Sequence, residues 1–196
     1  MKKLLAILSI AVVILAGCGG SGNFEAQTNW EIQDFTYENH RGEDVSLEDL
    51  KGTVWLSTFI FTNCTTVCPP MTFNLTDIQQ TLEEKGIVDY KIVEFSIDPE
   101  VDTPEVLQDY LANYDVVDES KWELLTGYSQ EHISKFAAES FKTLVKDDPS
   151  TDQVIHGVSF FLVDQNGVVV KSYNGATEVP KEEIVIDIET LIEDGK

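Results

Sequence analysis

The stretch TVWLSTFIFTNCTTVCPPMTFNL, residues 53–75, joins an apolar run to a helix through a loop that carries two cysteines. Residues 54–61 are mostly β-branched or aromatic, which predicts a strand buried on both faces of a sheet. Cys64 and Cys68 follow, and Pro69 fits the first turn of a helix, where the missing proline N–H would have no partner. This order places a dithiol at the point where a buried strand passes into a helix.

The position of the cysteines has chemical consequences. The first turn of a helix presents unpaired backbone N–H groups and the positive end of the helix dipole, and both stabilise a thiolate. A cysteine there can have a pKa well below the ordinary value of about 8.5. Because Cys64 and Cys68 are four residues apart, their sulfurs would lie on one helix face and could close a disulfide or bind one soft metal ion.

The N-terminal segment has the pattern of a secretory signal. Two lysines precede residues 4–15, an apolar run shorter than the roughly 20 residues of a membrane span. Leu15-Ala16-Gly17-Cys18 has the form of a bacterial lipobox, which predicts cleavage and a lipid on Cys18, although a plain signal peptide or an uncleaved anchor fits the run as well. We therefore predict a lipid-anchored protein on the extracytoplasmic face of the cell membrane, with a signal peptide (1–17), a lipidated flexible tether (18–28) and one domain (29–196).

With Cys18 assigned to lipid, Cys64 and Cys68 are the remaining thiols of an exported chain. A neighbouring pair in an oxidising compartment is expected to form a disulfide or a metal site. A purely structural disulfide would close too short a loop to constrain the unfolded chain much, so the pair favours chemistry over stability.

Three segments together resemble the SCO (SenC) family: the C-x-x-x-C-P motif, the run SIDPEVDTP at 96–104, and His156 within IHGVSFFLVDQNG. The resemblance extends from about Trp30 to the C-terminal helix. Thr65 stands where many relatives have a proline, a difference that bears on loop stiffness rather than on ligand identity.

The resemblance implies an α/β thioredoxin-like fold with a central mixed sheet flanked by helices. The broken alternation of residues 29–37, followed by a polar turn at 38–42, predicts an added N-terminal β-hairpin before the short segment 45–50. The resemblance also implies one copper ion, Cu(I) or Cu(II), held by Cys64, Cys68 and His156. His156 lies near the position where thioredoxin-like proteins usually carry a cis-proline that keeps metal from the thiols. The family helps to mature the copper A centre of cytochrome c oxidase, which implies oxidase subunit II as the partner.

Four further residues could belong to a site or to the surrounding structure. Asp98 follows a predicted strand at 90–97 and could orient the histidine or tune the thiols as a neighbour of the copper ligands, or simply organise its turn. Met71 could offer a thioether, but its helical spacing favours core packing. His40 and His132 are predicted to be solvated surface residues.

Composition excludes several function classes. The chain has 13 Lys and Arg against 35 Asp and Glu, a net charge of −22, which argues against nucleic acid or anionic lipid headgroups as partners. Structural zinc normally needs four protein ligands and iron–sulfur clusters need four cysteines. Two thiolates and one imidazole instead suit copper.

Two hypotheses of function stay open. One is a metallochaperone that delivers copper to the oxidase. The other is a thiol-disulfide oxidoreductase with a thioredoxin-like reductant, in which Cys64 attacks and Cys68 resolves the mixed disulfide. Peroxiredoxin activity is disfavoured, because Ser57 and Phe61 stand where that family has its proline and threonine.

Overall fold

The computed structural model describes residues 24–147 and 154–195. The predicted signal peptide and Cys18 lie outside the described residues, so the lipobox and the domain boundaries stay predictions. Within the described part of the chain, no helix is long and apolar enough to cross a membrane.

An eight-stranded mixed sheet forms the centre of the molecule, with the strand order β1-β10-β9-β4-β5-β6-β2-β3. The central strands β4, β5 and β6 are parallel, whereas β9 runs antiparallel to β4. Strands β7 and β8 form a separate antiparallel pair. The strands are β1 (Trp30–Glu31), β2 (Thr36–Asn39), β3 (Asp44–Ser46), β4 (Val54–Ile60), β5 (Tyr90–Ser96), β6 (Trp122–Thr126), β7 (Val145–Asp147), β8 (Val154–His156), β9 (Ser159–Val163) and β10 (Val168–Asn174).

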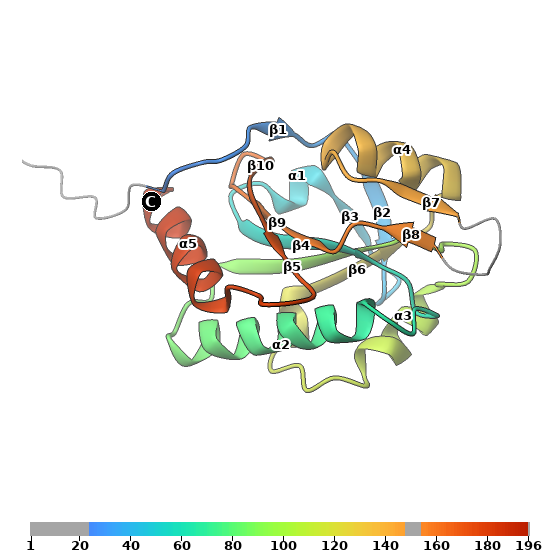
Figure 1. Cartoon of the computed structure of the whole chain (residues 1–196), viewed down its shortest axis with the longest axis horizontal. Helices are drawn as coiled ribbons and strands as arrows, with labels where there is room; N and C mark the ends of the chain where they lie inside the picture. Colours follow the sequence, from blue (N-terminus) through green and yellow to red (C-terminus); the bar gives the residue numbers. More distant parts are fainter. Residues whose placement is uncertain (1–23, 148–153, 196) are drawn as a thin grey trace, which may run out of the picture.

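Helices cover both faces of this sheet (Figure 1). The long helix α2 and the shorter α3 lie on one side, and α4 lies on the other. The C-terminal helix α5 packs against α2. The helices are α1 (Leu47–Leu50), α2 (Cys68–Glu84), α3 (Pro104–Leu111), α4 (Gln130–Ser140) and α5 (Lys181–Asp194). The predicted fold class, a mixed sheet flanked by helices, is confirmed.

The strand and the helix predicted on either side of the cysteine loop are both present, as β4 and α2. Every residue of β4 is buried, as expected for a strand at the centre of a sheet with both faces covered. In α2, Met71, Leu75, Ile78 and Leu82 are 0 % exposed, which confirms that this stripe is the core face of the helix. Met71 is therefore a core residue.

The predicted N-terminal hairpin is confirmed as β2 and β3, which pair antiparallel from Thr36 opposite Ser46 to Glu38 opposite Asp44. The segment after β3 is the short helix α1, which Ser46 and Asp49 begin with a reciprocal capping box. The hairpin joins the main sheet through β6, so it extends the sheet rather than standing apart from it.

The prediction that His40 is a solvated surface residue is wrong. Its side chain is 0 % exposed, and its Nδ1 accepts a hydrogen bond from the backbone N–H of Leu124. The cause is the neighbouring Arg41, whose guanidinium binds Glu123 and the carbonyl of Trp122 and so holds the turn against β6. His132 is exposed as predicted, with Nε2 2.7 Å from the Tyr37 hydroxyl.

Candidate metal centre

Three elements bring the predicted ligands together. Cys64 lies in the loop after β4, Cys68 is the first residue of α2, and His156 is the last residue of β8. One ligand atom from each lies within 4.8 Å of the other two. Both cysteines are buried and free, and His156 is half-buried. The fold therefore unites residues that are up to 92 positions apart, 64 to 156, in one compact group.

The imidazole of His156 is held in a defined orientation. Its Nδ1 lies 2.8 Å from the carbonyl oxygen of Gly157, so Nδ1 carries the proton and donates it to that carbonyl. Its Nε2 then presents a lone pair 3.5 Å from Sγ of Cys68. The ring edge of Phe61 packs against the imidazole, with centroids 5.9 Å apart. This is the tautomer that a metal ligand needs, with the other ring nitrogen fixed by a backbone partner.

The two thiols differ in their electrostatics. A hydrogen bond from the Cys68 thiol lowers the pKa of Cys64. Hydrogen bonds from the backbone N–H groups of Cys68 and Thr66 act in the same direction, whereas burial opposes them. The Cys68 N–H lies 3.4 Å from Sγ of Cys64, as expected at the start of a helix. The hydrogen bond to Cys64 and burial both raise the pKa of Cys68. Cys64 is thus the thiolate and Cys68 the thiol.

Asp102, a residue that sequence reasoning missed, holds the cysteine loop in place. Its carboxylate is 0 % exposed and accepts hydrogen bonds from the Thr62 hydroxyl at 2.5 Å and the Thr62 backbone N–H at 3.3 Å. It also accepts one from the Ser96 hydroxyl at 2.6 Å. Asp102 therefore ties the residues before Cys64 to the end of β5. Its only sequence signal is its place in the acidic run before Thr103 and Pro104.

Asp98, the predicted neighbour of the site, follows β5 and is half-buried. Its backbone N–H donates to the Ser96 hydroxyl, and its carbonyl accepts from the N–H groups of Val101 and Asp102. These bonds organise the turn that positions Asp102. Asp98 is not in the group formed by Cys64, Cys68 and His156, and its influence on that group stays a prediction.

A second missed residue is Glu94, near the middle of β5. It is 0 % exposed, and its charge acts on the buried Cys68 thiol. The signal in the sequence is a single carboxyl inside the apolar run IVEF, residues 92–95, where a charge is costly unless it is paired or used.

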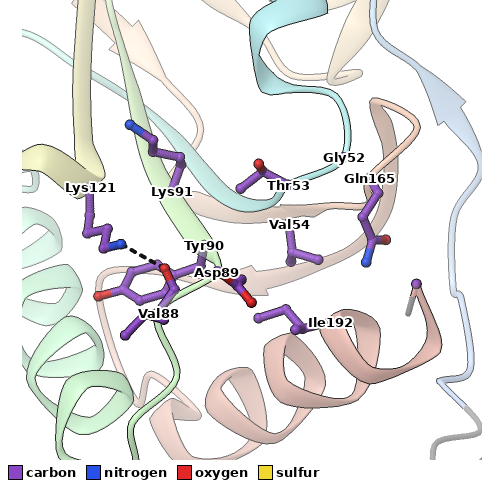
Figure 2. A pocket seen from close by; sticks show the side chains of 11 residues that line it. Gly52, Thr53, Val54, Val88, Asp89, Tyr90, Lys91, Lys121, Gln165 and Ile192 are labelled. Carbon is purple, nitrogen blue, oxygen red and sulfur yellow. Dashed lines mark hydrogen bonds between the residues drawn. The ribbon is translucent and has the colours of Figure 1, made fainter.

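The opposite end of the sheet carries a surface hollow of about 380 Å³ (Figure 2). It lies where β4 and β5 begin, whereas the cysteines lie beyond the end where these strands finish. Its lysines are already engaged, because Lys121 donates to the Val88 carbonyl at 2.7 Å and Lys91 to Glu123 at 2.8 Å. None of the predicted site residues lines this hollow.

The donor set fits a soft metal ion. Two sulfurs of buried cysteines and one nitrogen of a half-buried imidazole lie close together, and within the described residues the group has no fourth protein ligand. That combination suits copper rather than structural zinc, which takes four. Cys64, Cys68 and His156 could therefore form a copper site. The fold and this group define a thioredoxin-like protein with a dithiol–imidazole metal centre.

Comparison with known proteins places the chain in a family. The SCO1/SenC family model matches residues 24–193. The SCO1 protein homolog of Bacillus subtilis (strain 168) is 47 % identical over 178 residues, which cover 91 % of this chain and 91 % of that protein. The chain therefore belongs to the SCO1/SenC family.

Solved structures share the fold. A SCO1/SenC family lipoprotein from Bacillus anthracis str. Ames is 44 % identical with a TM-score of 0.80, covering 85 % of this chain and 98 % of that one. BsSco is described as a member of the Sco family of cytochrome c oxidase assembly proteins in which a disulfide switch was identified. It is 48 % identical with a TM-score of 0.77, covering 84 % of this chain and 94 % of that one. Bradyrhizobium japonicum ScoI, solved with copper bound, is 26 % identical with a TM-score of 0.69 and covers 82 % and 99 %.

Proposed function

We propose that this protein binds one copper ion through Cys64, Cys68 and His156 and assists the assembly of cytochrome c oxidase. The observation that carries the proposal is the convergence of two sulfurs and one oriented imidazole nitrogen within 4.8 Å. When bound, copper would supply an ion that can be passed on or can change oxidation state. The protein supplies the thiolate of Cys64, a fixed Nε2 on His156 and a loop held by Asp102.

The acceptor that we propose is the copper A centre on subunit II of the oxidase. Sco relatives are described as cytochrome c oxidase assembly proteins, and ScoI from Bradyrhizobium japonicum was solved with copper. With few protein ligands at the site, an incoming thiolate from a partner could join the copper before the cysteines let it go. A closed four-ligand site would resist such an exchange.

We propose further that the protein acts from the membrane surface, held by a lipid on Cys18 on the extracytoplasmic face. The lipobox pattern in the sequence supports this placement. The Bacillus anthracis relative is described as a lipoprotein, which supports it as well. A tether of this kind would keep the copper site close to an oxidase in the same membrane.

A second candidate function is thiol-disulfide exchange that reduces the cysteines of the oxidase copper site. The contrast between the two thiols favours it, since Cys64 is the thiolate that attacks and Cys68 the thiol that resolves. The disulfide switch described for BsSco also supports it. In this function His156 would matter less than the cysteines.

Complementation separates the two functions. A bacterium whose own SCO1/SenC gene is deleted would receive the parent gene or the variants C64S, C68S or H156A, and assembled copper A would be measured in its membranes. Copper delivery predicts that all three variants fail and that H132A, which changes an exposed histidine outside the group, succeeds. Full assembly with H156A but not with C64S would overturn copper delivery in favour of thiol reduction.

A further inference from the structure

The strand that carries His156 lies outside the main sheet. Within the described residues β8 pairs with β7 alone, in a separate two-stranded sheet. Two residues, Gly157 and Val158, join it to β9, which pairs with β4 and β10 in the main sheet. The position of His156 relative to the cysteines therefore depends on how this two-residue link is held.

Two consecutive carbonyl groups fix the link to different elements. The Ser159 carbonyl accepts a hydrogen bond from the Thr58 hydroxyl of β4 at 3.0 Å, which fixes the start of β9 to the main sheet. The Val158 carbonyl accepts one from the backbone N–H of Gly175 at 2.7 Å. Gly175 follows β10, so the residue nearer to His156 is held by the loop between β10 and α5.

This loop has a fixed shape at Gly175. A Cβ at this position would lie 2.7, 2.8 and 3.0 Å from three carbons of the Phe160 ring, which is 0 % exposed. Glycine thus lets the backbone pass close to the ring. The preceding Asn174 closes the turn, since its Oδ1 accepts hydrogen bonds from the N–H groups of Ala176 and Thr177.

Asn74 connects the loop to the helix of the dithiol. Its Nδ2 donates to the Gly175 carbonyl at 3.1 Å, across 101 positions of the sequence. It lies six residues after Cys68 on α2, about 9 Å along the helix axis. Asparagine is unfavourable inside a helix, because its side chain competes with the helix for backbone groups. Here the amide instead binds a backbone carbonyl of another segment.

We infer that Asn74 is a positioning residue for copper binding. Through Gly175 and Val158 it holds the strand of His156 against the helix that begins with Cys68. The inference rests on the copper function proposed above, and it names a residue that sets the geometry of that site without touching the metal. Ligands that are already in place bind an ion more tightly than ligands that must first be brought together.

A double-mutant cycle separates this role from a general effect on stability. If Asn74 acts through His156, its removal matters only while His156 is a ligand. We expect Asn74→Ala to weaken Cu(I) binding about three- to tenfold, as for one lost hydrogen bond. In a His156→Ala background the same change should alter the weaker affinity of the remaining dithiol by less than about twofold. Alanine is the better helix former, which favours folding of the variant.

The bridge can also be tested in the reduced protein without metal. Nε2 of His156 lies 3.5 Å from Sγ of Cys68, so protons of the two side chains should give a nuclear Overhauser effect. In Asn74→Ala we expect this signal to weaken and hydrogen exchange of the Gly175 amide to accelerate about three- to tenfold. Asn74→Asp should behave alike, since a carboxylate keeps the shape but cannot donate to a carbonyl.

The matched control is Gln80→Ala, which removes an exposed amide of the same helix that is bound to Glu84 within α2. It should keep the parent's copper affinity, Overhauser signal and exchange rate. An Asn74→Ala protein with undiminished copper affinity, or with an equal loss in both backgrounds, overturns the proposal. If that variant does not fold, Asn74→Asp is judged by the same two criteria.

Failure of this proposal and failure of the copper function give different results. A parent protein that binds copper, together with an Asn74→Ala protein that binds it equally well, overturns the role of Asn74 alone. A parent protein that binds no copper refutes the copper function. The metal-free measurements then decide on Asn74: a weakened Overhauser signal and faster exchange support its positioning role, and unchanged values overturn it.

Discussion

Replacing Asp102 should damage the copper site although the residue is not a ligand. The substitution Asp102→Ala removes a buried acceptor for three donors: the N–H and the hydroxyl of the half-buried Thr62, and the buried hydroxyl of Ser96. A buried donor left without a partner costs about 1–3 kcal/mol. Since both hydroxyls can rotate toward other acceptors, we take the low end of that range and expect the free energy of unfolding to fall by about 3–5 kcal/mol.

Asp102→Asn should be milder. Burial raises the pKa of Asp102, so the folded state binds a proton more tightly than the unfolded state, and this carboxyl's contribution to stability falls as the pH rises from 3.8 toward the raised pKa. The amide avoids that buried charge and keeps one acceptor oxygen for Thr62. We expect a loss of about 1–2 kcal/mol for Asp102→Asn near neutral pH.

The assay is urea unfolding of the metal-free reduced protein, paired with copper titration of the folded variants. Loss of the tie between Thr62 and β5 should weaken copper binding by tenfold or more, since Cys64 follows two residues later. Glu100→Ala, in the same loop but exposed, is the matched control and should change neither quantity. An Asp102→Ala protein with the parent's unfolding free energy and copper affinity would refute the positioning role.

Three further predictions concern the packing, orientation and charge of the ligands. Met71→Ala should lower the free energy of unfolding by about 2–5 kcal/mol, whereas Met71→Leu should keep the copper stoichiometry, and loss of copper with leucine would make Met71 a ligand. Gly157→Ala should weaken copper binding, because the new Cβ would lie 2.5 Å from Oγ1 of Thr143; adding Thr143→Ala should restore it, and no recovery would contradict the geometry. In the reduced metal-free protein, the ultraviolet absorbance of one thiolate should persist well below pH 9.0 and vanish in Cys64→Ser. Because the pKa of Cys64 is lowered in the folded state, its contribution to stability is full above pH 9.0 and declines as the pH falls from there. A thiolate that titrates near pH 9.0 would contradict the lowered pKa.

Local pattern was enough to predict the core of this protein and its dithiol. The apolar run before Cys64, the proline after Cys68 and the stripe through Leu75 are each encoded within a few neighbouring residues. The place of the two cysteines between a strand and the start of a helix then predicted a stabilised thiolate and a disulfide or a metal site. His156 needed more, because only its resemblance to a family pattern connected it to residues some 90 positions earlier.

The residues that were missed or misjudged depend on contacts between distant segments. Asp102 acts through its hydrogen bond with Thr62, which lies 40 residues earlier in the sequence. Glu94 is hydrogen-bonded to Thr72 of the helix α2, which precedes β5 in the sequence. His40 is buried because Arg41 reaches Glu123 on another strand. No local periodicity encodes such contacts, so tertiary structure was required to find them.

The most direct test of the copper site is anaerobic titration of the reduced protein with Cu(I) and Cu(II), in the parent, His156→Ala and His132→Ala. The signal is the visible thiolate-to-copper charge-transfer band of the Cu(II) form, with competition for Cu(I) by a chelator. We predict a one-to-one complex whose band and tight binding are lost in His156→Ala and kept in His132→Ala, which changes an exposed histidine outside the group. Undiminished affinity and an unchanged band in His156→Ala would contradict the copper site described here.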